Sequence, residues 1–200
     1  MTAQPLPHPE SPTIDHPLTI DEYAALGEIE HGHIELQEGS LVMSPSPTFF
    51  HMFVATELIN ALKAQLPGHL VVVLEVDIDL ALAPADQPGS SRRPDLIVVD
   101  RSSIGRLADE GGLVRASDVV LAVEIVSPGS RRMDHRIKRD EYADAGIPSY
   151  WIIDFDEPIS LIECHRTEEF GYQDGGAVTG TFRTTVPCEL TIDLDALRYT

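Results

Sequence analysis

Two short apolar segments, residues 96–99 and 119–126, constrain the fold of this chain more than any other feature. Both are rich in β-branched side chains and apolar on both faces, which is typical of strands in the middle of a covered sheet. Asp95 precedes the first segment, and Glu124 interrupts the second. A buried carboxylate is costly unless it is paired, hydrogen-bonded or bound to a metal. The two carboxylates therefore need a specific role.

A shared metal ion is one such role. If the two strands are antiparallel neighbours, the start of one and the end of the other meet at one edge, and Asp95 and Glu124 reach a common point. Oxygen ligands there suit Mg²⁺ or Mn²⁺, which can orient a water and stabilise charge on a phosphate. Two alternatives remain open: Asp95 also fits ordinary strand-entry chemistry after Pro94, and Glu124 also fits a buried salt bridge to an arginine.

A cation follows on a predicted helix over residues 134–145. Lys138 lies four residues after Asp134 and four before Tyr142, so the three share one helical face. Its ammonium could stabilise charge on a phosphate oxygen or position the attacking water. The alternative is a solvent-exposed pair between Lys138 and Asp134.

The pattern along the chain predicts an α/β or α+β fold with a central mixed sheet flanked by helices. Further helices are expected over 19–26 and 48–66, a hairpin over 33–44 with its turn near Gly39, and strands over 70–82 and 149–154. Added β segments are expected around Leu161, Phe182 and Leu190, with a turn at Gly175-Gly176. We expect the connections between the three middle strands to be too short or too irregular for crossover helices, which disfavours a doubly wound parallel sheet.

Length and composition predict one domain. Residues 18–200 can form a single core, and residues 1–17, which contain five prolines, are expected to be a flexible leader. No segment approaches the length of a membrane span, and no secretory signal is evident, so we expect a cytoplasmic protein without membrane contact. Cys164 and Cys188 show no metal-ligand spacing and are expected to be apolar fillers.

The charge of the chain complicates a nucleic-acid role. The formal net charge is −19, whereas a protein that neutralises phosphates usually presents a basic face. Ten of the fourteen basic residues nevertheless fall between Arg92 and Arg139, close to the candidate site. Local potential at a cleft can differ in sign from the global charge. The alternative explanation of this clustering is a solvated, arginine-rich helix face.

Several motifs together resemble the Uma-two family, a restriction-endonuclease-like family within the PD-(D/E)XK nuclease superfamily. The resemblance covers about residues 19–155, and its most specific part is 124–154. The motifs are Glu35-Leu36 with Gly39, Ser44-Pro45-Ser46-Pro47 with His51, Arg93-Pro94-Asp95, Glu124-Ile125-Val126-Ser127-Pro128, Lys138, Tyr142, and Gly146-Ile147-Pro148 with Tyr150-Trp151.

The resemblance implies a restriction-endonuclease-like core and a role for each site residue. Asp95 corresponds to the metal-binding aspartate and Glu124 to the acidic residue of the second half-motif. Val126 stands where that motif usually has lysine, and Lys138 is similar to a migrated replacement. Glu35 would be a further acidic residue near the metal, and His51 a polar group at the start of the first core helix, where an anion is favoured. Tyr142 and Trp151 are more typical of core aromatics than of base-stacking platforms.

The leading hypothesis is a metal-dependent endonuclease acting on DNA, in which Asp95 and Glu124 bind Mg²⁺ or Mn²⁺ and Lys138 assists. A homodimer is expected, because cutting both strands of a duplex favours two-fold symmetry. A second hypothesis is a catalytically silent nuclease-like module for binding or assembly, motivated by the net charge and the displaced lysine. A third is a hydrolase of small phosphate esters, which would require a closed pocket too narrow for a duplex.

Overall fold

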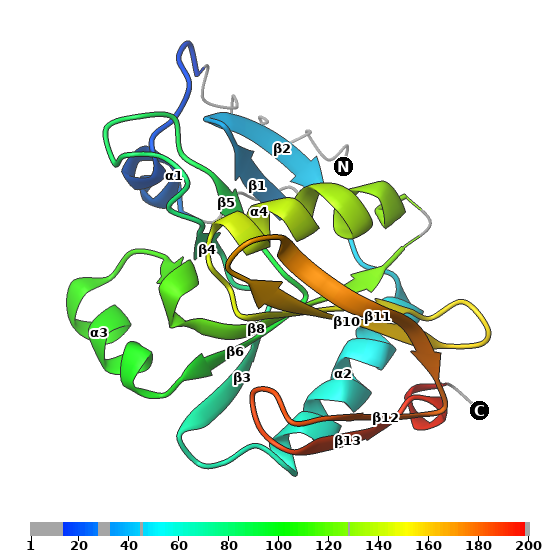
Figure 1. Cartoon of the computed structure of the whole chain (residues 1–200). Coiled ribbons are helices and arrows are strands. Elements are labelled where there is room, and N and C mark those ends of the chain that lie inside the picture. Colours follow the sequence, from blue (N-terminus) through cyan, green and yellow to red (C-terminus); the bar gives the residue numbers. More distant parts are fainter. Residues whose placement is uncertain (1–13, 28–32, 45, 128, 199–200) are drawn as a thin grey trace, which may run out of the picture.

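A six-stranded mixed sheet forms the centre of the computed structural model, which describes residues 14–27, 33–44, 46–127 and 129–198. The strand order is β11-β10-β9-β8-β6-β3, and neighbours are antiparallel except for the parallel pair β8 and β9. The bounds are β3 Leu70–Leu74, β6 Leu96–Asp100, β8 Val119–Val126, β9 Ser149–Asp154, β10 Ser160–Thr167 and β11 Gly171–Thr179. The predicted mixed sheet is confirmed (Figure 1).

Two smaller sheets flank this centre. Within the described ranges, one has five strands in the order β2-β1-β5-β4-β7, and the other pairs β12 with β13. The bounds are β1 His33–Gln37, β2 Ser40–Ser44, β4 Ile78–Asp79, β5 Ser91–Arg92, β7 Val114–Arg115, β12 Thr181–Thr184 and β13 Leu190–Asp193. The β1–β2 hairpin and the strands β12 and β13 are predicted β additions, whereas the segment expected around Leu161 joins the main sheet as β10. Strands β5 and β7 were not expected from the sequence. The five-stranded sheet also carries part of the candidate site.

Local sequence signals explain the N-terminal elements. Helix α1 (Ile20–Ala25) begins with a capping box, in which the Thr19 hydroxyl accepts the Glu22 N–H and the Glu22 carboxylate accepts the Thr19 N–H. The predicted hairpin is β1 and β2. Its turn places Glu38 at φ 47° and Gly39 at φ 79°, and a Cβ on Gly39 would lie 2.6 Å from Pro17 Cβ. Glycine is therefore required there for both its backbone and its size.

The main sheet is buried on both faces. Alternate residues of β8 point to opposite sides: Leu121 and Val123 pack with helix α2 (Phe49–Lys63), and Ala122 and Val126 pack with helix α4 (Lys138–Asp144). Figure 1 shows α2 and the β12–β13 hairpin on one side of the sheet and α4 on the other. By this alternation Glu124 belongs to the side covered by α4, which decides its neighbours.

One helix contradicts the sequence prediction. Helix α3 (Ser102–Glu110) connects β6 to β8, although this connection appeared too short or irregular for a helix. The helix is short, and Ile104 and Leu107 are its large apolar residues, with Gly105 between them lowering the helix propensity. Ser103 is its one buried residue, and Ile104 is 42% exposed. Since β6 and β8 are antiparallel, α3 is not a parallel crossover, and the expectation against a doubly wound sheet stands.

Two strand predictions were also wrong in detail. The strand expected over 70–82 ends at Leu74, because φ is 45° at Glu75, and the chain then enters the smaller sheet as β4. Gly175 and Gly176 form no turn: they lie inside β11, opposite a register shift between Ile162 and Cys164 of β10. Such a bulge inserts an extra residue into a strand, and glycine there imitates a turn signal in the sequence.

The predicted helix over 134–145 is confirmed, with an irregular first part. Residues Met133–Ile137 form a π-helical turn, η2, directly before α4. π turns often occur at functional sites. Asp134 and Lys138, which lie at this turn, are both buried, at 2% and 6% exposure. The wider turn thus keeps two charged residues on the sheet side of the helix.

Most of the predicted leader, residues 1–13, lies outside the described ranges. Leu18 is buried and donates its N–H to the Gly39 carbonyl at 2.8 Å. Ile14, which belongs to the predicted leader, packs against the same apolar cluster as Leu18. Among the described helices, none has the length and apolar character needed to cross a membrane.

Candidate functional site

Asp95 and Glu124 lie side by side at one edge of the main sheet. Leu96 of β6 pairs with Val123 of β8, so the residue before β6 lies beside the next residue of β8. The Asp95 Oδ2 accepts the Ile125 N–H at 2.6 Å, which fixes the carboxylate against the end of β8. The antiparallel pairing expected from the sequence therefore brings the two residues together.

Glu124 is buried against α4 rather than paired with an arginine. It is 4% exposed, and its Oε1 accepts hydrogen bonds from Lys138 Nζ at 2.8 Å and Tyr142 Oη at 2.7 Å. Burial raises the pKa of Glu124 well above its ordinary value; the Lys138 ammonium opposes this, but the carboxylates of Asp95 and Asp134 add to the increase. The site holds more carboxylate than the nearby ammonium can neutralise.

Lys138 lies between two carboxylates inside the protein. Its Nζ is 3.1 Å from Glu35 Oε1 and 2.8 Å from Glu124 Oε1, and its side chain is 8% exposed. Burial acts to lower the pKa of Lys138, but Glu124, Glu35 and Asp134 outweigh it and raise the pKa above its usual range. The ammonium is therefore charged. The solvent-exposed pair with Asp134, considered as an alternative from the sequence, is not what forms.

Glu35 belongs to the same cluster, although it comes from the smaller sheet. Its Oε1 accepts the Arg93 backbone N–H at 3.0 Å, and its Oε2 accepts a hydrogen bond from Arg92 Nη1 at 3.0 Å. Burial acts to raise the pKa of Glu35, but Lys138 and these donors outweigh it and lower the pKa. Glu35 is thus an ionised carboxylate that holds Lys138 in place.

His51 reaches the same edge from α2, where it is the third residue. Its Nε2 lies 3.1 Å from Asp95 Oδ2 and 3.1 Å from the Ile125 carbonyl oxygen. Burial acts to lower the pKa of His51, but the hydrogen bond and charge of Asp95 outweigh it, so the pKa is raised. In the described part of the chain, the buried Nδ1 has no hydrogen-bond partner. His51 is therefore more than a helix-start residue.

The donor atoms at this edge suit a hard divalent cation. The described contacts of Asp95 fall on Oδ2 and those of Glu124 on Oε1, so within the described ranges Oδ1 and Oε2 keep their lone pairs for a ligand. The Ile125 carbonyl faces the same point. Across the described residues, no cluster of three or more His, Cys, Asp or Glu has metal-binding geometry. A cation held there would use two carboxylates, a backbone carbonyl and water, the pattern common for Mg²⁺.

These residues line a cleft of about 490 Å³. The polar side of its lining includes Glu35, His51, Asp95, Glu124, Asp134 and Lys138, and the apolar side includes Val42, Met43, Met133 and Phe155. All five site residues named from the sequence, with Glu35 and His51 among them, therefore border one space.

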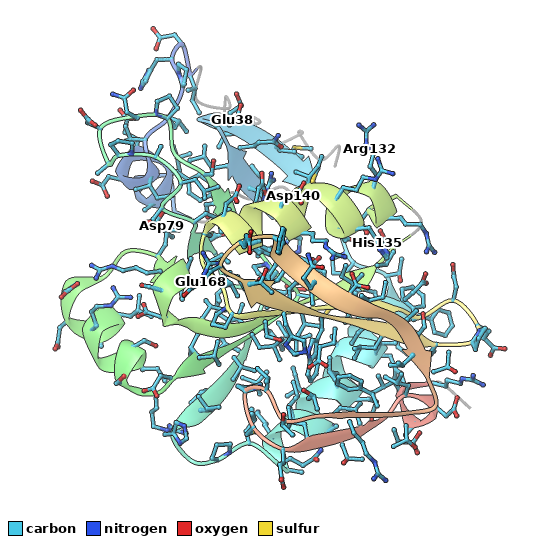
Figure 2. All side chains as sticks on the ribbon, viewed as in Figure 1. Glu38, Asp79, Arg132, His135, Asp140 and Glu168 are labelled. Carbon is cyan, nitrogen blue, oxygen red and sulfur yellow. The ribbon has the colours of Figure 1, made fainter. Side chains whose placement is uncertain are left out.

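The arginines near the site are divided between ion pairs and the surface. Arg131 pairs with Asp154, and Arg139 lies 2.6 Å from Asp174. Arg132 is exposed, and Figure 2 shows it pointing away from the body of the molecule. The basic cluster seen in the sequence is thus not one continuous face.

Two contributions were missed by sequence reasoning. Arg92 was noticed only as part of the Arg-Arg-Pro-Asp run, yet its guanidinium is 0% exposed and joins Glu35 to Glu141. The backbone groups of Ile125 and Arg93 also bind site carboxylates. An arginine next to an apolar strand was the available signal for the first, whereas backbone contacts leave no residue-type signal.

The mixed sheet with an acidic pair at the meeting edge of β6 and β8, and helices on both faces, defines a restriction-endonuclease-like protein. The family model described as "Uma2: Putative restriction endonuclease" matches residues 20–194, and the chain belongs to this family. The resemblance stated from the motifs is confirmed.

A solved structure supports the fold independently. It is described as a putative nuclease belonging to DUF820 from Anabaena variabilis ATCC 29413. The two are 20% identical in sequence, the match covers 90% of this chain and 97% of that chain, and the TM-score is 0.64. No curated protein matches this chain. At this identity the similarity establishes a shared fold.

Proposed function

We propose that this chain is a metal-dependent endonuclease that hydrolyses DNA phosphodiester bonds. One observation carries the proposal: Asp95 and Glu124 meet at one strand edge in a cleft, and Lys138 Nζ lies 2.8 Å from Glu124. The family description as restriction endonucleases supports DNA as the substrate. A homodimer would place two such sites on opposite strands.

Asp95, Glu124 and the Ile125 carbonyl would hold Mg²⁺ or Mn²⁺. When bound, the ion would lower the pKa of a water and stabilise charge on the phosphate. The Lys138 ammonium lines the cleft and can bind a phosphate oxygen or orient the attacking water. Tyr142 fixes the rotamer of Glu124 through its hydroxyl.

The contacts of Glu124 favour this function over a silent binding module. A salt bridge from Glu124 to an arginine would favour the silent module, and the described partners are instead a lysine and a tyrosine. Hydrolysis of small phosphate esters would require a closed pocket, whereas the space beside Glu124 is a cleft at the surface.

The direct test is cleavage of plasmid and linear duplex DNA by purified protein with Mg²⁺ or Mn²⁺. Asp95→Asn and Glu124→Gln should each lower the rate by at least about 10²-fold, because each removes a charge from the metal site. EDTA should stop cleavage by the unmodified protein.

Matched controls are available on the surface. Asp109→Asn and Glu169→Gln make the same chemical changes at exposed positions outside the cleft, and both should leave the rate unchanged. Equal cleavage by the Asp95 and Glu124 variants would show that the activity comes from a contaminant or another site. Absence of cleavage in the unmodified protein, with no metal binding, would favour the silent module.

A further inference from the structure

The cleft beside the acidic pair has an apolar lining that the proposed hydrolysis does not use. Val42 and Met43 come from β2, Met133 from the π-helical turn η2, and Phe155 from the position after β9. Met43 is 71% exposed, so packing in the core does not explain its place. A phosphate, a metal ion and a water all need polar partners. The lining therefore suits an apolar group that accompanies the phosphate.

The size of the cleft matches one nucleotide better than a duplex. Its volume of about 490 Å³ lies within the range of about 300–1,000 Å³ found for sites that enclose one small ligand. In a duplex the faces of the bases are covered by stacking, and a base enters a pocket only when it is unpaired or turned out of the stack. An unpaired base can therefore contact the apolar lining, whereas a paired base cannot.

The charge near the cleft also favours contacts with bases. The net charge of the chain is −19, and two arginines next to the site, Arg131 and Arg139, form ion pairs with Asp154 and Asp174. Neutralisation of phosphates, the usual source of affinity for a duplex, is therefore weak here. Stacking of a base on an aromatic ring and contact with a methionine side chain do not require a basic surface.

From these observations we infer that the cleft takes a nucleotide with an unpaired base, whose phosphate lies at the acidic pair and whose base lies against Met43, Met133 and Phe155. The inference rests on the proposed function and adds to it the form of the substrate: a strand that is single or locally unpaired at the cleavage site. Phe155 is the stacking partner, because its ring lines the cleft and its packing against the main core holds it in place.

Fluorescence anisotropy of labelled DNA tests this separately from cleavage, with Ca²⁺ in place of Mg²⁺ to slow hydrolysis. The probes are a single strand, the corresponding duplex, and the same strand with abasic sites in its centre. The abasic strand keeps the phosphates and lacks the bases, so it isolates the contribution of the bases. The unmodified protein should bind the single strand at least about tenfold more tightly than either of the other probes.

Two variants of the lining have matched controls outside the cleft. Phe155→Leu should weaken binding of the single strand by at least about fivefold and binding of the duplex by less than about twofold, because the stacking ring is lost. Phe170→Leu makes the same change at an exposed ring and should alter neither affinity. Since Phe155 also contacts the core, the exposed Met43 provides a second variant, Met43→Gln, with Leu82→Gln as its control.

Three outcomes would overturn the inference. Equal affinity for the single strand and the abasic strand would show that no base is bound, and metal-dependent cleavage of DNA would then leave the proposed function intact. Self-association that Met43→Gln abolishes without a change in strand binding, seen by size-exclusion chromatography, would assign the apolar lining to contact between copies of this chain. Absence of binding to every probe would overturn both the inference and DNA as the substrate.

Discussion

Glu35 lies between two buried cations that differ in their surroundings. On one side, Arg92 Nη1 donates to Glu35, while its Nε and Nη2 donate to the two oxygens of Glu141, each at 2.6 Å. On the other side, Lys138 contacts Glu35 and Glu124 with one ammonium. Both cations share Glu35, but they do not share a cleft: Lys138 borders it and Arg92 does not.

The difference separates an ion pair that holds the fold from one available for chemistry. A guanidinium has a planar set of donors that matches a carboxylate, and Arg92 uses that set on two partners. Lys138 instead faces Glu124, Glu35 and the nearby Asp134, so its surroundings carry excess negative charge. A divalent cation bound by Asp95 and Glu124 would relieve that excess. We expect the ion pairs of Arg92 to control stability and those of Lys138 to control activity.

The largest expected effect on stability comes from Arg92→Met. It removes the cation that pairs with Glu141 and one of the two cations that contact Glu35, so the free energy of unfolding should fall by about 3–5 kcal/mol. Urea denaturation measures this value. Arg131→Met is the control, because its pairs are half-exposed and should contribute at most about 1 kcal/mol. An equal loss of unfolding free energy in the two variants would contradict the structural role assigned to Arg92.

Lys138→Met should lower the rate of DNA cleavage strongly and the free energy of unfolding only moderately. Glu35 keeps Arg92, and Glu124 has a raised pKa and can take up a proton, so the loss of stability should be smaller than for Arg92→Met. DNA cleavage should fall by about 10²–10³-fold, because a preorganised charge at the phosphate is lost. Lys138→Arg should not restore the rate, since a guanidinium does not fit the position of an ammonium. Normal cleavage by Lys138→Met would make Lys138 a structural residue like Arg92.

Tyr142→Phe should produce the smallest change. It removes one hydrogen bond to Glu124 Oε1 and leaves Lys138 as the remaining donor, so the expected loss of stability is about 1 kcal/mol. Cleavage should fall less than in Lys138→Met, because the charge is retained. A stability loss as large as that of Arg92→Met would mean that Tyr142, rather than the arginine, dominates the buried polar network.

The sequence predicted those parts of the fold that carry periodic or local signals. The capping box at Thr19, the hairpin turn at Gly39 and the apolar strands around Asp95 and Glu124 were identified because each depends on neighbouring residues. Helix α3 was missed because it is short and contains Gly105, and the glycines of β11 suggested a turn because a bulge has the same composition.

The sequence by itself determined which residues could do chemistry: an aspartate at a strand entry, a glutamate that interrupts an apolar strand, and a lysine four residues from two polar neighbours. Only the tertiary structure decided how they are combined. It pairs Glu35, from the smaller sheet, with both Lys138 and Arg92. It also places His51 within hydrogen-bond distance of Asp95 and the Ile125 carbonyl. These contacts join residues that lie between 44 and 103 positions apart in the sequence. Residues so far apart in the sequence meet because the two sheets pack against their helices, and no local sequence pattern encodes that packing.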